Sequence, residues 1–426
     1  MQNYVSVEEA VSLIKSGDRI FSHGSACTPN FLIDELARQS SRLKNVEFVS
    51  ITQQGNVEVA KPQYKDSFFI NSLFVSTPVR DAVNSERGDF VPVFLSEIPI
   101  LFKNGIMPLD VAMITVSPPD THGYCTLGTS VDVARSAIDN AKLIIAQVNP
   151  KMPRTHGEGM IHVNTINKMV WHDEELLTID YGAKVTDCEM IIGKNIAELI
   201  DDKSTLQMGI GTIPDAVLHC LHNHKDLGVH TEMISDGIID LVAKDIINNK
   251  FKGIHSNRTI TSFAFGTRKL YDFIDDNPSF EFMDVEHVNY PINIMKNKKM
   301  VAINSAIEID LTGQVCADSI GTFQFSGIGG QMDFMRGAAL SEGGKPIIAI
   351  SSRTKKGIPR IAPYLKQGAG VVTTRGHIHY VVTEFGVANL YGKNLLQRAK
   401  ALIEISHPDD REMLEKATFE RFKIGH

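Results

Sequence analysis

A glutamate ends a strand-like run in residues 228–240, GVHTEMISDGIID. Val229 and Thr231 are β-branched and alternate with polar side chains, as in a strand with one buried face. Glu232 then stands just before a turn-forming Ser-Asp-Gly and a second apolar segment. Open α/β sheets keep their functional groups at the carboxyl ends of strands. The pattern makes Glu232 a candidate functional carboxylate, with a solvent-facing surface glutamate as the alternative.

Two glycine-rich turns stand on either side of this glutamate in the sequence. QMGIGTIPDAV (207–217) and FSGIGGQMDFMRGAALSEGG (325–344) each read as a strand, a G-x-G turn and a helix. Glycine lets a backbone approach a ligand closely and can point N–H groups at developing negative charge. Neither turn is a dinucleotide-binding fingerprint or a Walker loop, because the further motif residues are missing. A purely structural turn is the alternative for each one alone, whereas two at β-to-α junctions favour a site.

Other catalytic and metal-binding patterns are weaker. His377 and His379 alternate as on a strand, but no carboxylate or cysteine joins them at ligand spacing, so no metal site is expected. GTSVD (128–132) lacks the second glycine of a nucleophile elbow. Cys125 could be a thiol nucleophile, although a small buried cysteine is more common. The five cysteines are odd in number and never form a CxxC pair, which favours a reducing cytoplasm over disulfides.

The composition is that of an ordinary globular protein. The chain has 426 residues, of which 43% are hydrophobic and 22% charged, so two domains are the default. A net charge of −7 without a basic block argues against nucleic-acid binding. No apolar run is long enough for a transmembrane helix, and the N-terminus lacks the pattern of a secretory signal. The expected location is the cytoplasm, with no membrane partner.

The order of the elements predicts an α/β fold. Apolar strand-like runs alternate with helix-like stretches, which is typical of mostly parallel sheets covered on both faces. The expected strands are residues 45–51, 110–117, 141–148, 345–351 and 368–374. Helices are expected over residues 28–39 and 129–141, and over 394–422 with a break at HPDD.

A faint internal repeat places the domain boundary. IFSHGSACTPNFLIDE (20–35) resembles TLQMGIGTIPDAVLHC (205–220), because each has a strand, a glycine and a proline five residues later, then an amphipathic helix. Chance similarity of two βα units is the alternative. If the repeat is real, two related open α/β domains cover residues 1–190 and 191–426, and the second carries Glu232. We expect the active site in the cleft between them, where ligand sites are common.

Motifs along essentially the whole chain resemble the acetyl-CoA hydrolase/transferase family of class I CoA-transferases. Besides GVHTEMISDGIIDL and the two glycine turns, they are SPPDTHGYCTLG (117–128), NPKMPRTHGEGMIH (149–162), AINSAIEIDLTGQV (302–315), ADSIGT (317–322) and VVTEFGVANLYGK (381–393). Cys316, in GQVCAD, departs from the asparagine expected there. The resemblance implies two α/β domains with the active site between them.

The resemblance also implies a set of site residues. Glu232 matches the family's catalytic glutamate. The oxyanion-stabilising amides fall at Ile210 and at either Gly329 or Gly330, an ambiguity that the motifs leave open. Asn289, in HVNYPI, and Glu384, in TEFGVANL, match further site residues. The remaining residues expected to contact substrate or CoA are Gly209, Gly211, Gly327 and Gln331.

The reaction implied is CoA transfer between short-chain acids, 4-hydroxybutyrate or butyrate with acetyl-CoA and acetate, in a ping-pong sequence through a glutamyl-CoA thioester. Hydrolysis of acyl-CoA by the same glutamate is one alternative, and a non-catalytic ligand-sensing module is another. We expect no metal and no tightly bound cofactor, with the CoA thioester as substrate and a homodimer or higher homo-oligomer as the assembly.

Recognition of a hydroxylated acid would need a buried hydrogen-bonding group. The polar candidates on expected loops are His23, Gln53, Gln54 and His122, and the candidates for local contacts to anionic CoA are Arg154 and Arg336.

Overall fold

The computed structural model describes residues 4–209 and 211–422, which divide into two compact units. Unit 1 comprises residues 1–179, 260–288 and 324–329, and unit 2 comprises residues 180–259, 289–323 and 330–426. The predicted domains, 1–190 and 191–426, are consecutive, whereas in these units residues 260–288 and 324–329 return to unit 1 after the chain has entered unit 2.

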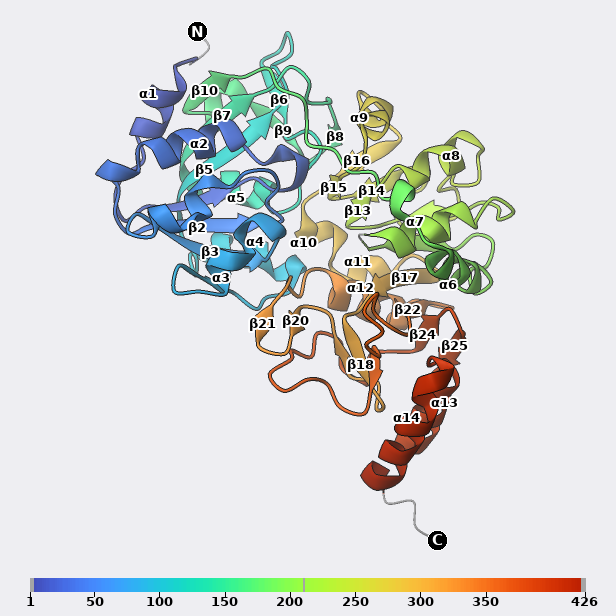
Figure 1. The fold of residues 1–426 in the computed structure, drawn as a ribbon. Helices are drawn as coiled ribbons and strands as arrows, with labels where there is room; N and C mark the ends of the chain where they lie inside the picture. The colour runs from blue at the N-terminus through green and yellow to red at the C-terminus, as the bar shows by residue number, and fades with distance from the viewer. Residues whose placement is uncertain (1–3, 210, 423–426) are drawn as a thin grey trace. The chain divides into compact units, whose positions relative to one another are not determined.

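Unit 1 contains a seven-stranded sheet whose six strand pairings are all parallel (Figure 1). Its order is β10-β7-β5-β1-β2-β3-β4. The strands are β1 (Arg19–Ser22), β2 (Val46–Ile51), β3 (Phe68–Phe74), β4 (Gly88–Phe90), β5 (Leu109–Val116), β7 (Ala141–Val148) and β10 (Lys168–Trp171). The longer helices of this unit are α1 (Val7–Ser12), α2 (Asn30–Arg38), α4 (Ile98–Lys103), α5 (Ala134–Asn140) and α9 (Arg268–Ile274).

Alternation along the strands gives this sheet two buried faces. Ile20 belongs to a core cluster that includes apolar residues of α1 and α2. The next residue, Phe21, points to the opposite face, where its ring meets Phe102 of α4 edge to face at 6.0 Å between centroids. Because both faces are covered, the central strands are apolar almost throughout, as the sequence pattern indicates.

Unit 2 is built on a six-stranded sheet in the order β12-β11-β17-β22-β24-β25. Only the last pairing, between β24 and β25, is antiparallel. The strands are β11 (Thr205–Met208), β12 (Gly228–Val229), β17 (Met300–Ser305), β22 (Lys345–Ala349), β24 (Tyr380–Thr383) and β25 (Gly386–Asn389). The helices are α6 (Asp187–Ala197), α7 (Thr212–His219), α8 (Gly237–Ala243), α11 (Pro291–Met295), α12 (Gln331–Leu340), α13 (Leu395–Glu404) and α14 (Pro408–Phe422).

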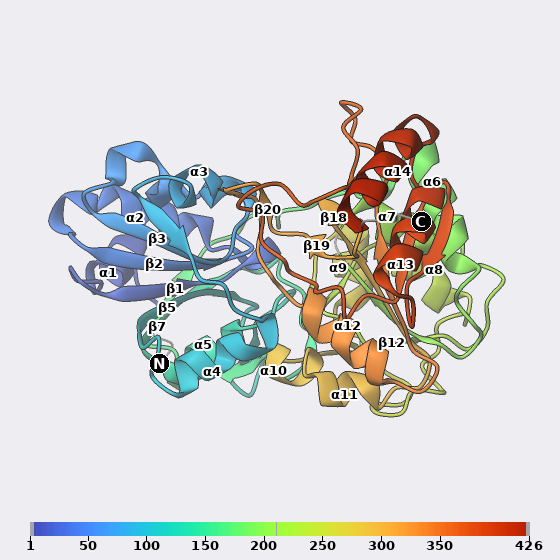
Figure 2. The ribbon, with the colours of Figure 1, turned by 90° about the horizontal axis from the view of Figure 1, so that it is seen from below.

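The predicted α/β class with mostly parallel sheets is confirmed, and so are most of the expected elements. The break expected at HPDD within residues 394–422 is confirmed, because α13 and α14 are two separate helices that pack side by side (Figure 2). Helix α5 starts later than predicted, because Asp132 has a φ of +24° and its side chain accepts a hydrogen bond from Ala134 N–H. The strand expected over 368–374 is wrong: Gly368 has a φ of +83° and the segment makes only one bridge, between Thr373 and Val315.

Candidate active site

Glu232 lies where the chain leaves the sheet of unit 2. It follows β12 and precedes β13 (Met233–Ile234), on a bend rather than within a strand. Its side chain is half-buried. Strand β12 is shorter than the sequence run suggested, but the position of Glu232 at the carboxyl end of a parallel strand is the expected one.

The side-chain amide of Asn289 holds the Glu232 carboxylate. Asn289 is completely buried, between α10 (Val285–Val288) and α11, and its Nδ2 donates a hydrogen bond to Glu232 Oε2 at 3.1 Å. Asn289 Oδ1 has no hydrogen-bond partner among the described residues. A hydrogen bond to a charged carboxylate stabilises its ionised form and restricts its rotamers. Asn289 and Glu232, far apart in the sequence, are therefore arranged as expected for a nucleophilic carboxylate and the amide that orients it.

Gly330 packs directly against this pair. It is the N-cap residue of α12, and a Cβ atom at this position would overlap both Glu232 Oε2 and Asn289 Nδ2. Only glycine leaves room for the carboxylate here. The start of a helix also favours nearby negative charge, because its first N–H groups lack partners within the helix. Of the two glycines left open by the sequence, Gly330 is the one whose backbone touches Glu232.

Gly327 and Gly329 have a different environment, within unit 1. A Cβ atom at either position would come within 3.0 Å of the Phe74 ring. Gly329 has a φ of +58°, and its carbonyl accepts a hydrogen bond from Leu95 N–H at 3.0 Å. These two glycines are thus needed for the turn itself and for its packing on Phe74.

The other glycine turn begins at the carboxyl end of β11. Gly209 N–H donates to Ile303 O at 3.0 Å, which fixes the start of the turn on β17. Gly211 has a φ of +126°, a conformation that other residues rarely adopt, and is the N-cap of α7. Ile210, the predicted amide donor of this turn, lies outside the described residues.

Gln331 and Glu384 are engaged by their own neighbours. Gln331 Nε2 donates to Ser305 O at 2.8 Å, and its Oε1 accepts from Thr373 Oγ1 at 2.9 Å. Glu384 accepts two hydrogen bonds from Ser352, one from the backbone N–H at 2.9 Å and one from the hydroxyl at 2.5 Å.

The predicted site residues of unit 2 lie on the side of its sheet where the parallel strands have their carboxyl ends, but they do not form one cluster there. Glu232 follows β12 and Glu384 follows β24, four strand positions away in the sheet order. At about 4.8 Å per strand, the two strand ends are roughly 19 Å apart. Asn289 and Gly330 therefore belong to the Glu232 cluster, and Glu384 to a second cluster on the same edge.

One residue at this edge was missed by the sequence reasoning. Glu189 forms a capping box with Thr186 at the start of α6, and its carboxylate also accepts a hydrogen bond from the Thr212 hydroxyl. Thr212 is the first residue of α7, directly after the glycine turn. The T-x-x-E spacing of 186–189 was a visible capping signal, whereas the second contact needed the tertiary structure.

Several polar candidates from the sequence are already committed to hydrogen bonds within unit 1. His23 and Gln53 are both fully buried. The ring Nε2 of His23 lies 2.6 Å from Ser130 O, and Gln53 Nε2 donates to the carbonyls of Ser22 and His23. Arg154 forms an ion pair with Asp120 at 2.8 Å. These side chains hold loops in place.

The alternative of a thiol nucleophile at Cys125 finds no support in its surroundings. Burial raises the pKa of the Cys125 thiol to about 12, so almost none of the reactive thiolate is present at neutral pH. All five cysteines are free thiols.

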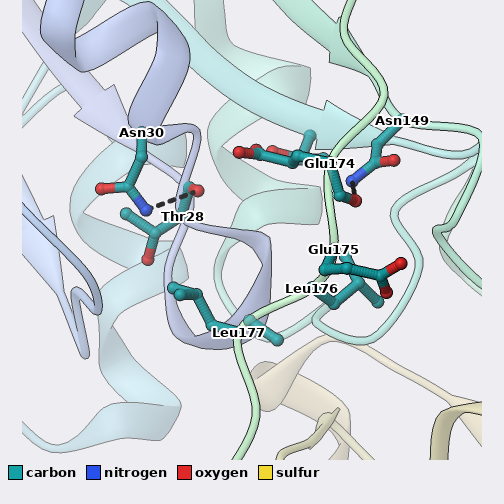
Figure 3. A pocket seen from close by; sticks show the side chains of 9 residues that line it. Thr28, Asn30, Asn149, Glu174, Glu175, Leu176 and Leu177 are labelled. Carbon is teal, nitrogen blue, oxygen red and sulfur yellow. Dashed lines mark hydrogen bonds between the residues drawn. The ribbon is translucent and has the colours of Figure 1, made fainter. Parts of the chain in front are cut away.

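A separate polar cavity of about 30 Å³ opens at the carboxyl edge of the unit 1 sheet (Figure 3). Thr28 and Asn30 reach it from the segment after β1, Thr115 from β5, and Asn149 and Glu174 from the opposite side. Strands β1 and β5 are neighbours whose following segments run to opposite sides of the sheet, the usual place for a crevice in such folds. The carboxylate of Glu174 makes this lining unsuited to the carboxylate of an acid substrate.

Within residues 4–209 and 211–422, no helix is long and apolar enough to cross a membrane. In the same part of the chain, no group of three or more His, Cys, Asp or Glu side chains could hold a metal ion.

Comparison with known proteins places these features in a family. Residues 1–179 match the model of the acetyl-CoA hydrolase/transferase N-terminal domain, and residues 266–418 match that of the C-terminal domain. A succinyl-CoA:acetate/propanoyl-CoA:succinate CoA transferase of Fasciola hepatica is 50% identical over 98% of this chain and 88% of its own length. A 4-hydroxybutyrate coenzyme A transferase of Clostridium kluyveri is 48% identical over 99% of this chain and 98% of its own length.

The structural comparison agrees. The crystal structure of a 4-hydroxybutyrate CoA-transferase from Porphyromonas gingivalis has a TM-score of 0.85 and 38% identity, covering 99% of this chain and 98% of that one. An acetyl-CoA hydrolase of Yarrowia lipolytica is more distant, at 25% identity over 81% of this chain and 74% of its own length. From its motifs, its fold and its full-length relatives, this chain belongs to the acetyl-CoA hydrolase/transferase family.

Proposed function

We propose that this chain is a CoA-transferase that moves CoA between short-chain carboxylic acids, with Glu232 as the covalent nucleophile. The observation that carries the proposal is the Glu232–Asn289 hydrogen bond beneath Gly330, where no side chain fits. A carboxylate suits this reaction because each species it forms remains an activated acyl compound, so the free energy of the thioester is kept.

The proposed sequence begins when a Glu232 oxygen attacks the acyl-CoA carbonyl and the CoA thiolate leaves, giving a mixed anhydride. The thiolate then attacks the glutamyl carbonyl and expels the donor acid as its carboxylate, leaving a glutamyl-CoA thioester. The carboxylate of the acceptor acid repeats both steps in reverse and regenerates Glu232. Release of the first acid before the second enters predicts ping-pong kinetics.

Each of these attacks creates a tetrahedral oxyanion. Backbone N–H groups of the two glycine turns, at Ile210 and at Gly330 or Gly329, are the proposed donors. Losing one oxyanion donor typically lowers the rate on the order of 10²–10³-fold. The touching backbone of Gly330 and the nearby start of α12 support Gly330 over Gly329.

The proposed acids are 4-hydroxybutyrate or butyrate, exchanged against acetyl-CoA and acetate. The full-length similarity to proteins named for 4-hydroxybutyrate supports this choice. The relative named for succinate and propanoyl-CoA makes succinate the competing acid. Acyl-CoA hydrolysis by the same glutamate is the second candidate function, which the lower identity of the hydrolase relative disfavours.

We also propose that the enzyme works in the cytoplasm as a homodimer or higher homo-oligomer. The CoA thioester enters as a substrate, and we propose no resident cofactor. Five free cysteines suit a reducing compartment. Light scattering of the purified protein would test the assembly.

The decisive test compares the wild type with Glu232→Gln. Mixing with acetyl-CoA and then borohydride should tag Glu232 in the wild type alone, and butyrate-dependent loss of acetyl-CoA should disappear in the variant. Exchange at the wild-type rate in Glu232→Gln would refute the covalent role. Loss of acetyl-CoA that no added acid accelerates would point instead to hydrolysis.

A further inference from the structure

Thr231 joins the segment that carries Glu232 to the strand that leads into the glycine turn. Its side chain is completely buried. Met208 N–H donates to Thr231 Oγ1 at 3.2 Å, and this hydroxyl lies 3.2 Å from Met208 O and 3.0 Å from Met233 O. One hydroxyl therefore accepts from β11 and can donate its single proton to either carbonyl.

This contact lies where the backbone hydrogen bonding between β11 and β12 ends. Leu206 pairs with Val229 in the parallel ladder, and His230 N–H donates to Leu206 O at 3.1 Å. The next N–H of β11 that faces this neighbour, that of Met208, is bound by the Thr231 hydroxyl instead of by a backbone carbonyl. A side chain thus takes over the pairing, and the backbone is released to bend at Glu232.

Thr231 and Met208, which these hydrogen bonds link, each precede a proposed functional residue. Thr231 is directly before Glu232, and Met208 is directly before Gly209. The other side of the turn's first residue is fixed on β17, through the hydrogen bond from Gly209 N–H to Ile303 O. The Thr231 hydroxyl therefore contributes, together with the His230–Leu206 backbone hydrogen bond, to setting the Glu232 segment against the start of the glycine turn.

We propose that Thr231 is a positioning residue for the transfer reaction, whose hydroxyl fixes the position of Glu232 relative to Gly209, the first residue of the glycine turn. The inference rests on the proposed function of Glu232. Valine has nearly the same shape but no hydroxyl, so Thr231→Val should let the two segments slip apart while the core stays filled. Misplacement of reacting groups by about 1 Å can lower the rate on the order of 10²-fold.

The test compares Thr231→Val with Thr231→Ser and with Thr418→Val. Thr418 is also buried, and its hydroxyl donates to Leu414 O at 2.8 Å within α14. It therefore controls for loss of a buried hydroxyl elsewhere in the chain. We expect Thr231→Val to lower kcat and the rate of Glu232 labelling about 10- to 100-fold with little change in KM. Thr231→Ser and Thr418→Val should keep kcat within about threefold of the wild type, since neither loses the Thr231 hydroxyl contact.

The outcomes separate this inference from the proposed function. Wild-type kcat in Thr231→Val, with Glu232→Gln inactive, would overturn the role of Thr231 alone. Activity in Glu232→Gln would overturn the proposed function itself. Equal losses in Thr231→Val and Thr231→Ser would also overturn the inference, because the serine variant keeps the hydroxyl. Circular dichroism and thermal melting of each variant establish that the compared proteins are folded.

Discussion

Asn289 Nδ2 donates to Glu232 Oε2 across 57 positions of sequence, and the glycine at 330 closes over both. The amide favours the ionised carboxylate, which is the nucleophilic form, and limits its rotation. Since Asn289 is fully buried, solvent cannot replace the lost donor easily if the side chain is removed.

Asn289→Ala should therefore lower kcat/KM. A hydrogen bond to a charged group contributes about 1.5–3 kcal/mol, which corresponds to a loss on the order of 10- to 100-fold. Steady-state rates of the wild type and the variant measure this loss. An unchanged kcat/KM in Asn289→Ala would show that Asn289 does not support Glu232.

Gly330→Ala should inactivate the enzyme without unfolding it. The new methyl group would displace Glu232 and Asn289, both of them side-chain ends that can move. A displacement of about 1 Å is expected to lower kcat on the order of 10²-fold. Gly376→Ala is the matched control, since a Cβ atom there would meet only Thr374 Oγ1, at 3.7 Å. Kinetics and thermal melts of the two variants would be compared. Equal activity of both would contradict the close approach at Gly330.

The stability of unit 1 should depend on the ionisation of Asp284. Burial raises the pKa of this carboxyl to about 6, although Ser136 and the Glu286 N–H donate hydrogen bonds to it. The folded protein thus binds this proton more tightly than the unfolded chain does. The contribution of protonated Asp284 to the free energy of unfolding is fully present below pH about 4. It is lost as the pH rises through 6, by roughly 3 kcal/mol in total.

Urea unfolding at several pH values from about 3 to 8 would measure that loss, with Asp284→Asn as the comparison. Because the amide does not titrate, the variant should lose less stability than the wild type between pH 5 and 8. Identical pH dependence in the two proteins would show that Asp284 has an ordinary pKa.

Thiol reagents should leave the activity intact. Burial raises the pKa of Cys27 and of Cys125 to about 12, so at pH 8 only about one molecule in 10⁴ carries either thiolate. Treatment of the native protein with iodoacetamide, followed by peptide mass mapping, should find both unmodified, whereas in urea all five cysteines should react. Inactivation that accompanies labelling of Cys125 would reopen the thiol-nucleophile alternative.

Much of the scaffold was predictable because buried parallel strands have a simple signature. The runs at 110–117 and 141–148 match β5 and β7 to within one residue, since both are mostly apolar and are followed by turn residues. Residues 368–374 also contain an apolar and β-branched run, but Gly368, with a φ of +83°, breaks the extended backbone, and a Cβ atom at 370 would collide with Asp318. Local apolar character was a poor guide where glycine conformation decided the outcome.

The candidate site was predictable as a set of residues but not as a geometry. Glu232 and the glycine turns follow from their places at strand ends and from family motifs. Which glycine touches the carboxylate depends on where α12 begins, and the sequence leaves this open between 329 and 330. The hydrogen bonds of His23 and Gln53 to backbone carbonyls could not be predicted from the sequence either, because they join separate loops.

The returning segments 260–288 and 324–329 bear on how this protein can be dissected. A single cut near residue 190 would separate residues 1–179 from segments 260–288 and 324–329, which pack with them in unit 1. The N-terminal fragment would lack α9, and the C-terminal fragment would carry that helix without its sheet. We therefore expect the two fragments to regain the native packing when they are co-expressed, and not when each is expressed alone.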